Sequence, residues 1–176
     1  MRKIDGFTVI ELIVILVVLG ILAAIAVPGF SRWGADLRLK SAVRDLKSDM
    51  ALAKLQAIRE NADVALLFDT ANNRYTVFVD DGAGGGSAGD WIQNGSEVLI
   101  KTEIIASDVT MYDASFAGGA ARCRFNSRGY PEGLDGNDDH VYMRNNDNEY
   151  RGVVLSPLGN VRTQESPDGV TWTDVD

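Results

Sequence analysis

The most distinctive chemical group in this sequence is the carboxylate of Glu11, which lies inside an apolar run from Phe7 to Val27. An ionised group surrounded by hydrocarbon costs about 3 kcal/mol or more unless another group compensates it. Glu11 is therefore expected to be paired, protonated or functional. The alternative is a charge that is tolerated near lipid headgroups.

A second set of oxygen donors is concentrated in one short segment of the last third of the chain. Carboxylates and amides that alternate in a tight turn can converge on a hard cation such as Ca²⁺. The segment lacks the spacing of an EF-hand loop and its bidentate glutamate, so a solvated hairpin turn is the preferred interpretation and a calcium site is the alternative. The candidate ligands are Asp135, Asn137, Asp138 and Asp139.

A glycine-rich stretch between Asp80 and Asp90 also carries a carboxylate at each end. Its glycines and alanines offer only backbone carbonyls, which makes the roughly six to eight oxygen ligands of Ca²⁺ hard to assemble. No Gly-Lys-Ser/Thr sequence follows the glycines, so a phosphate-binding loop is excluded. The stretch is interpreted as a flexible surface loop.

The chain has one thiol, Cys123, and one imidazole, His140. A single cysteine excludes an intramolecular disulfide, and a small buried core residue is the preferred role for it. A Cys-His catalytic pair is open on composition, but no neighbouring residue marks either side chain as activated. No other acid-base, metal or nucleophile arrangement emerges, so the sequence predicts a protein that is not an enzyme.

The composition also bears on partners. The chain has 17 basic and 25 acidic residues and a formal net charge of -8, which argues against the body as a nonspecific binder of nucleic acid. Its 176 residues suffice for one folded domain with an appendage.

The apolar run that contains Glu11 is long enough to be a membrane-spanning helix, since about 20 helical residues cross the ~30 Å hydrocarbon core. Pro28 closes this run, and Arg2 and Lys3 precede it. Basic residues are retained in the cytoplasm, so the short N-terminus is predicted to stay there and the rest of the chain to be extracytoplasmic. We assign residues 7–28 to this transmembrane helix.

The following segment, residues 29–62, is predicted to continue the helix to about Glu60, with a bend at Pro28 or Gly34 and a stop at Asn61. Apolar residues recur at three- and four-residue intervals, which predicts an amphipathic helix with one buried face. They are Leu39, Val43, Leu46, Met50, Ala53 and Ala57. The interleaved charges are interpreted as a solvated face; they are Arg38, Lys40, Arg44, Asp45, Lys47 and Asp49.

Residues 63–176 change to the two-residue period of strands, separated by turn-forming segments. The predicted strands are 64–68, 74–79, 97–105, 109–112, 122–126, 141–144 and 152–156. The turn Ala71–Asn73 joins the first two as a hairpin. The predicted fold class is α+β, with a long N-terminal helix packed on an antiparallel β-sheet domain.

The N-terminal residues resemble the cleavage and methylation motif of type IV prepilins and pseudopilins. The matching sequence is Gly6-Phe7-Thr8-Val9-Ile10-Glu11-Leu12. The resemblance implies that residues 1–6 are a leader and that residues 7–28 form the assembly helix. It also implies that a prepilin peptidase cuts after Gly6 and methylates Phe7, and that Glu11 neutralises the amino terminus of a neighbouring subunit during assembly. Pro28 falls where many members of this family carry a helix-kinking proline.

The rest of the chain resembles the minor subunits of the GspH/FimT family through VALLFDTANNRYTVFVDDG, FNSRGYP and VVLSPLGNVR. The resemblance implies a minor structural subunit of a type II secretion pseudopilus or a type IV pilus. Its implied partners are other pilin or pseudopilin subunits, the peptidase and an inner-membrane assembly platform. Its implied location is the bacterial inner membrane, single-pass with the C-terminal domain in the periplasm, and then the filament.

A DNA-binding minor pilin that acts in DNA uptake is the alternative function. Some relatives bind DNA through a C-terminal GRxR-like segment, which corresponds here to Gly159-Asn160-Val161-Arg162. Asn160 replaces the first arginine, and acidic residues surround the second. Arg162 and Arg151 are the candidate DNA-binding residues, with Arg122, Arg124 and Arg128 as a patch if the fold gathers them.

Overall fold

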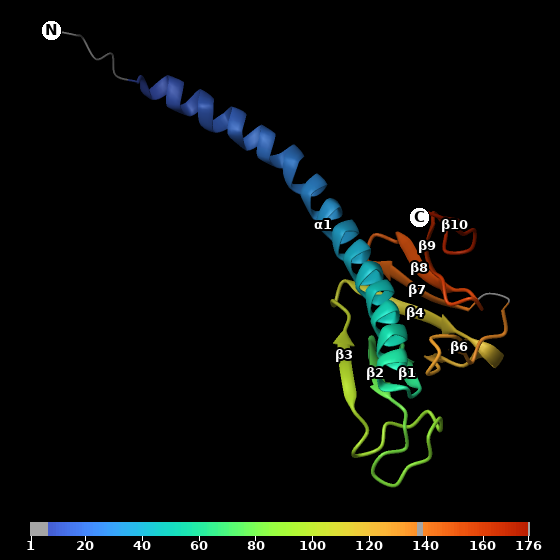
Figure 1. Ribbon diagram of the computed structural model, residues 1–176. Coiled ribbons are helices and arrows are strands. Elements are labelled where there is room, and N and C mark those ends of the chain that lie inside the picture. The colour runs from blue at the N-terminus through green and yellow to red at the C-terminus, as the bar shows by residue number, and fades with distance from the viewer. Residues whose placement is uncertain (1–6, 137–138, 176) are drawn as a thin grey trace. The chain divides into compact units, whose positions relative to one another are not determined.

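The computed structural model describes residues 7–136 and 139–175, apart from the side chains of residues 25–32. The chain forms two compact units, Met1–Gly34 and Ala35–Asp176. Helix α1, Val9–Glu60, contributes residues to both units (Figure 1). Predictions that fall on the leader with Gly6, on Asn137 and Asp138, and on the side chain of Pro28 lie outside the described residues.

The first unit is the N-terminal part of α1. Its described apolar side chains are exposed, and the helix is continuous through Pro28. Among the residues described, no helix combines the length and hydropathy needed to cross a membrane.

The part of α1 in the second unit buries the apolar stripe that the sequence predicts. Its six residues are at most 1% exposed; they are Leu39, Val43, Leu46, Met50, Ala53 and Ala57. Asn61 ends the helix in the left-handed conformation (φ 51°), and the amide of Ala62 donates to the carbonyl of Ala57 at 3.3 Å. This is the bond pattern of a Schellman C-cap, so the predicted stop at Asn61 is confirmed.

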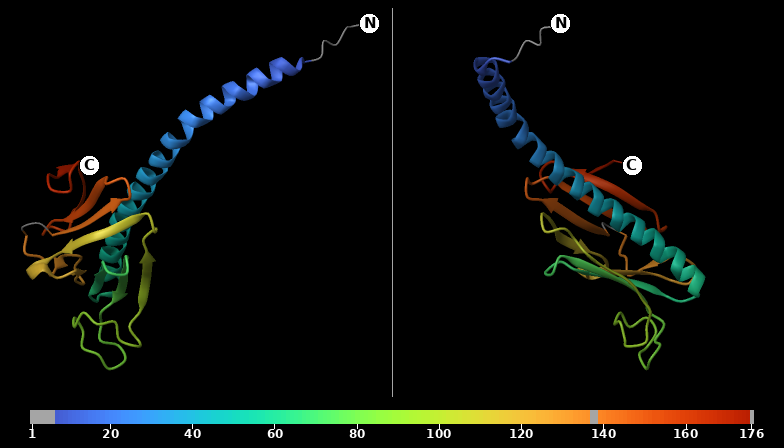
Figure 2. Two further views of the ribbon diagram at one scale, coloured as in Figure 1. Left: turned by 180° about the vertical axis from the view of Figure 1, so that it is seen from behind. Right: turned by 90° about the vertical axis from the view of Figure 1, so that its left-hand side faces the viewer.

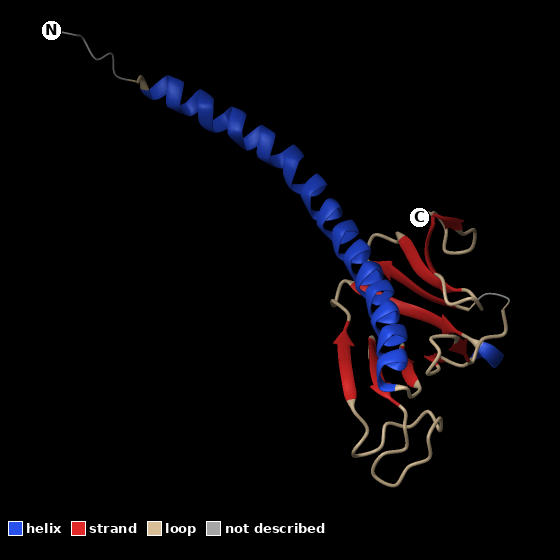
Figure 3. Ribbon diagram, in the orientation of Figure 1, coloured by secondary structure: helices blue, strands red, loops and turns tan. Residues whose placement is uncertain are grey.

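The body contains two antiparallel five-stranded sheets (Figure 3). In order across the first sheet, the strands are β3 (Leu99–Ile104), β2 (Arg74–Val79), β1 (Val64–Asp69), β5 (Arg122–Phe125) and β6 (Pro131–Glu132). Across the second sheet they are β10 (Thr173–Asp174), β9 (Val161–Ser166), β8 (Tyr150–Leu155), β7 (His140–Asn145) and β4 (Val109–Ser115). A 3-10 turn, η1 (Ala117–Gly119), follows β4. The predicted α+β class is confirmed.

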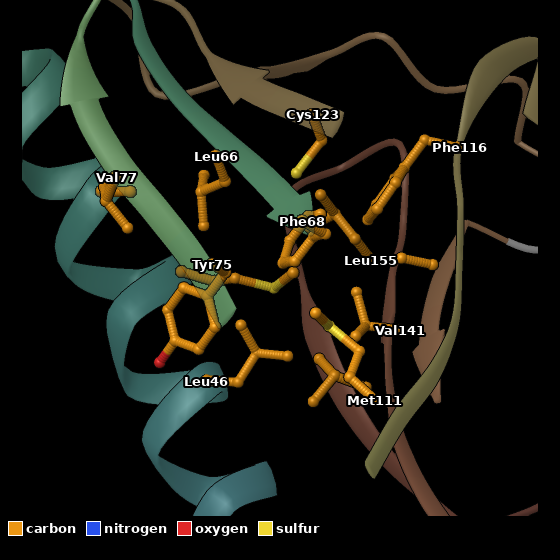
Figure 4. Packing of buried hydrophobic residues seen from close by; sticks show 14 of the residues in the cluster. Leu46, Leu66, Phe68, Tyr75, Val77, Met111, Phe116, Cys123, Val141 and Leu155 are labelled. Atoms are coloured by element: carbon orange, nitrogen blue, oxygen red, sulfur yellow. The ribbon is translucent and has the colours of Figure 1, made fainter. Parts of the chain in front are cut away.

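One hydrophobic core joins the second half of α1 to both sheets. The ribbon shows this part of the helix lying against the strands (Figure 2). Leu46 from the helix, Tyr75 from β2 and Met111 from β4 lie within it (Figure 4). Cys123 is fully buried in the same core, and this burial raises the pKa of its thiol. The prediction of a small buried hydrophobe at Cys123 is confirmed.

Asn73 links the two sheets at the β1–β2 turn. It adopts a left-handed conformation (φ 52°), which asparagine tolerates better than most residues. Its amide Nδ2 donates to the carbonyl of Val109 at 2.7 Å, and its Oδ1 accepts from the amide of Met111 at 2.8 Å. The hairpin of the first sheet is thereby bonded to β4 of the second.

Replacing Asn73 with alanine is expected to lower the free energy of unfolding by about 2 kcal/mol, because two partly buried backbone groups lose their partner. Asn73→Gly, which allows the left-handed backbone without the side chain, should lose most of the same amount. Asn72→Ala removes an exposed bond to Asp69 and should cost about 0.5 kcal/mol or less. Urea unfolding of the full chain in non-ionic detergent measures these values, and equal losses at positions 72 and 73 would contradict the link.

The prediction that Asp49 lies on a solvated helix face is wrong, because Asp49 is only 7% exposed. Tyr75 Oη donates a short hydrogen bond to Asp49, and Lys101 Nζ lies 2.8 Å from Asp49 Oδ2. Lys101 also lies 3.1 Å from Glu103. A helical period alone does not show that a lysine of β3 and a tyrosine of β2 would face this carboxylate.

Candidate functional site

Glu11 lies in the first turn of α1 and forms a reciprocal N-cap with Thr8. Its Oε2 accepts from the amide of Thr8 at 2.9 Å and from the Thr8 hydroxyl at 2.8 Å. The amide of Glu11 donates to Thr8 Oγ1 at 3.3 Å. This is a capping box, in which the residue before the helix and the third helical residue satisfy each other's amides.

The capping box holds the carboxylate one turn from Phe7, which is 80% exposed. Glu11 also borders an apolar hollow of about 280 Å³ that Phe7, Ile10, Val14 and Ile15 line. The carboxylate thus lies beside an apolar surface. Such a site suits a partner that carries a positive charge next to its own apolar side chains. Glu11 is recognisable in the sequence because a charge inside an apolar run is energetically costly. The cap was not predicted, although the Thr-x-x-Glu spacing is its signal.

The proposed calcium ligands are only partly described. Asp139 is 2% exposed, and its two oxygens accept from the amides of Asp135 at 3.2 Å and Gly136 at 2.9 Å. Asp139 thus holds the backbone of its own turn. Within residues 7–136 and 139–175, no group of three or more His, Cys, Asp or Glu side chains is placed to hold a metal ion. A calcium site involving Asn137 and Asp138 stays a prediction.

The fold separates Cys123 from His140. Val141 and Met143 of β7 point into the core that contains Cys123, so His140 lies on the opposite face of the same strand. There His140 stacks on Tyr142 with ring centroids 3.8 Å apart, and its Nε2 lies 3.2 Å from a carboxylate oxygen of Asp113. The two side chains do not form the catalytic pair that composition left open.

The glycine-rich loop is fastened at both ends by buried carboxylates. Asp80 is 0% exposed and accepts from the amides of Gly89 and Trp91, at 2.9 and 3.1 Å. Glu97 is 4% exposed and accepts from the amides of Gly82 and Asn94, at 2.9 and 2.8 Å. These anchors were not predicted, because nothing in the sequence around Asp80 and Glu97 shows that their carboxylates are buried.

Acidic neighbours form ion pairs with three of the five arginines proposed to contact DNA. Arg162 of β9 lies 2.7 Å from Asp174, and Arg151 of β8 lies 2.9 Å from Glu165. Arg124, in the first sheet, lies 2.8 Å from Glu132. Phosphate binding needs accumulated positive charge, so these ion pairs give the DNA-uptake alternative no support.

Two family models match this chain. Residues 42–159 match "Type II transport protein GspH", and residues 1–27 match "Prokaryotic N-terminal methylation motif". The pilin-like protein PilA1 of Thermus thermophilus is 39% identical over 79 residues, which are 44% of this chain and 49% of that protein. The match thus spans about half the length of that relative.

Solved structures share the fold at low identity. The minor pseudopilin EpsH of the Vibrio cholerae type 2 secretion system superposes with a TM-score of 0.54 at 14% identity, over 74% of this chain and 99% of that chain. The type IV minor pilin FimU of Pseudomonas aeruginosa superposes with a TM-score of 0.52 at 12% identity, over 74% and 99%. Since the family model covers more than half of the sequence, the chain belongs to the GspH family and carries an N-terminal methylation motif.

Proposed function

We propose that this chain is a minor structural subunit of a type IV pilin-like filament, either a type II secretion pseudopilus or a type IV pilus. The proposal rests on one observation: the same chain matches the GspH family model and the N-terminal methylation motif. The α+β body and the capped carboxylate at Glu11 support it. The role is structural and needs no catalytic group of its own.

The proposed path begins with a precursor anchored in the bacterial inner membrane by residues 7–28, with its body in the periplasm. A prepilin peptidase removes residues 1–6 by cutting after Gly6, a position where hydrogen as the side chain leaves the scissile bond unhindered. The new N-terminal residue, Phe7, becomes methylated. An inner-membrane platform then transfers the subunit into the filament, where α1 packs with other pilin-type helices.

Inside the filament, Glu11 pairs with the amino terminus of a neighbouring subunit. Both charges would otherwise be buried without a partner, which is costly in an apolar bundle. The pairing therefore favours one axial register of adjacent helices. Pro28 lies within the helix and is proposed to let it flex during assembly.

The intact mass of the membrane-extracted protein tests the processing step. We expect the chain to lose Met1–Gly6 and gain one methyl group in cells that contain the prepilin peptidase, and to remain whole in cells that lack it. Gly6→Val should block cleavage, because a branched side chain crowds the scissile bond. Gly20→Ala is the matched control, since a Cβ there meets nothing within 4 Å. A wild-type chain that stays uncleaved beside the peptidase would refute the proposal.

A further inference from the structure

The second unit contains a hollow of about 420 Å³ between α1 and the C-terminal strands. Four cationic side chains border it, and no Asp or Glu belongs to its lining among the residues that the structure describes. Two valines and the hydroxyl of Thr163 complete the wall. The cations of this basic groove are Lys40, Arg44, Lys47 and Arg151. Such a concentration is unexpected in a chain with a net charge of -8.

The four cations differ in how they are held. Lys40 Nζ lies 2.5 Å from Asp36, and Arg151 lies 2.9 Å from Glu165, so both are fixed in place by carboxylates that line a neighbouring hollow. Lys47 Nζ donates to Thr163 Oγ1 at 3.5 Å. Arg44 is exposed and forms no ion pair within the described part of the chain. Lys40 and Arg151 already have carboxylate partners, so the argument for a charged partner rests on Arg44, which is open to solvent at the groove.

We propose that the basic groove binds an acidic segment of an adjacent filament subunit, an inference that rests on the proposed function. Charge complementarity selects carboxylates, because interfaces between subunits juxtapose opposite charges and avoid like ones. A guanidinium such as that of Arg44 can accept a carboxylate in bidentate geometry. The contact would position the folded body of one subunit on the next.

The neighbouring hollow favours a protein segment over a nucleic acid. It measures about 580 Å³, shares Lys40 and Arg151 with the basic groove, and is also lined by Asp36, Glu149 and Glu165. A continuous phosphate backbone that leaves the basic groove on this side would meet these carboxylates. A protein segment can place an acidic residue in one hollow and a neutral or basic residue in the other.

Binding of a fluorescent hexaglutamate peptide to the purified full chain, in non-ionic detergent at low salt, tests the groove. We expect Arg44→Glu to weaken binding by about tenfold or more. Arg128→Glu, an identical charge change at an exposed turn outside the groove, should stay within about twofold. Absence of peptide binding, or an equal loss in both variants, would overturn the proposal. If a short DNA duplex binds more tightly than the peptide and this binding also depends on Arg44, the proposal of an acidic protein segment as occupant is wrong.

The identity of the occupant is tested in cells with a photo-cross-linking amino acid at position 44. A cross-linked partner that carries a prepilin-type N-terminal motif supports the inference, and a partner of another class overturns it. The peptide assay needs neither leader cleavage nor filament formation. A failure of the proposed function would therefore appear in the mass measurement, while a failure of the groove would appear in peptide binding.

Discussion

Replacing Asp49 with alanine is expected to lower the free energy of unfolding by about 3 kcal/mol. The carboxylate is nearly buried between α1 and the first sheet, where it accepts from Tyr75 Oη and Lys101 Nζ. Alanine leaves both donors without this acceptor. This value is at the lower end of the range for removing one partner of a buried ion pair. The reason is that the Lys101 side chain is 34% exposed and still has Glu103 as a partner at 3.1 Å.

Urea unfolding of the full chain in non-ionic detergent, followed by near-ultraviolet circular dichroism, measures this loss. Asp45→Ala is the matched control on the same helix. Asp45 is exposed, and among the described residues its side chain accepts a single 3.3 Å bond, from Ser41. This variant should cost about 0.5 kcal/mol or less. The double variant Asp49→Ala/Lys101→Met removes the stranded charge and should recover part of the loss. Equal losses at Asp45 and Asp49 would contradict a structural role for the cluster.

The pH dependence of stability is a second readout of the same cluster. Hydrogen bonding to Asp49 raises the pKa of Lys101, and burial together with Asp49 raises the pKa of the Tyr75 hydroxyl. Both groups therefore bind their proton more tightly in the folded chain than in the unfolded one. Their contribution is complete below the unfolded pKa values of about 10 and declines as the pH rises above them. This alkaline decline should be smaller in Asp49→Ala.

The sequence was sufficient to predict features that depend on local spacing. The stripe from Leu39 to Ala57 follows the helical period, and Asn61 has the residue type that ends helices in the left-handed conformation. The hairpin of β1 and β2 was predicted because two alternating apolar segments flank the turn Ala71–Asn73. These signals lie within a few residues of the structure that they specify.

Features that depend on distant partners were not predicted. Strand β9 is half-buried along most of its length and carries Arg162, Thr163, Gln164 and Glu165, so it shows no alternation of apolar residues. It is a strand because β8 and β10 pair with it. Asp49 is buried by residues of β2 and β3, far away in sequence. Its spacing in the helix carries no sign of that contact.

Replacing Glu11 with alanine is expected to reduce incorporation into filaments by about tenfold or more, because the amino terminus of the neighbouring subunit would be buried without a counter-charge. Alanine also removes the cap on Thr8, so this variant alone does not distinguish pairing from capping. Quantitative immunoblotting of sheared filaments against the membrane fraction measures the effect. Intact mass confirms that each variant is processed.

Two further variants separate these roles. Glu11→Gln keeps a side chain that can complete the capping box but has no charge. Thr8→Val removes the hydroxyl that bonds to Glu11 and keeps the carboxylate. If the carboxylate acts by pairing with a neighbouring amino terminus, Glu11→Gln should fail to assemble as Glu11→Ala does, while Thr8→Val should assemble at close to the wild-type level. The reverse pattern, with Glu11→Gln competent and Thr8→Val defective, would make Glu11 a helix cap and leave the register of the filament to apolar packing of α1.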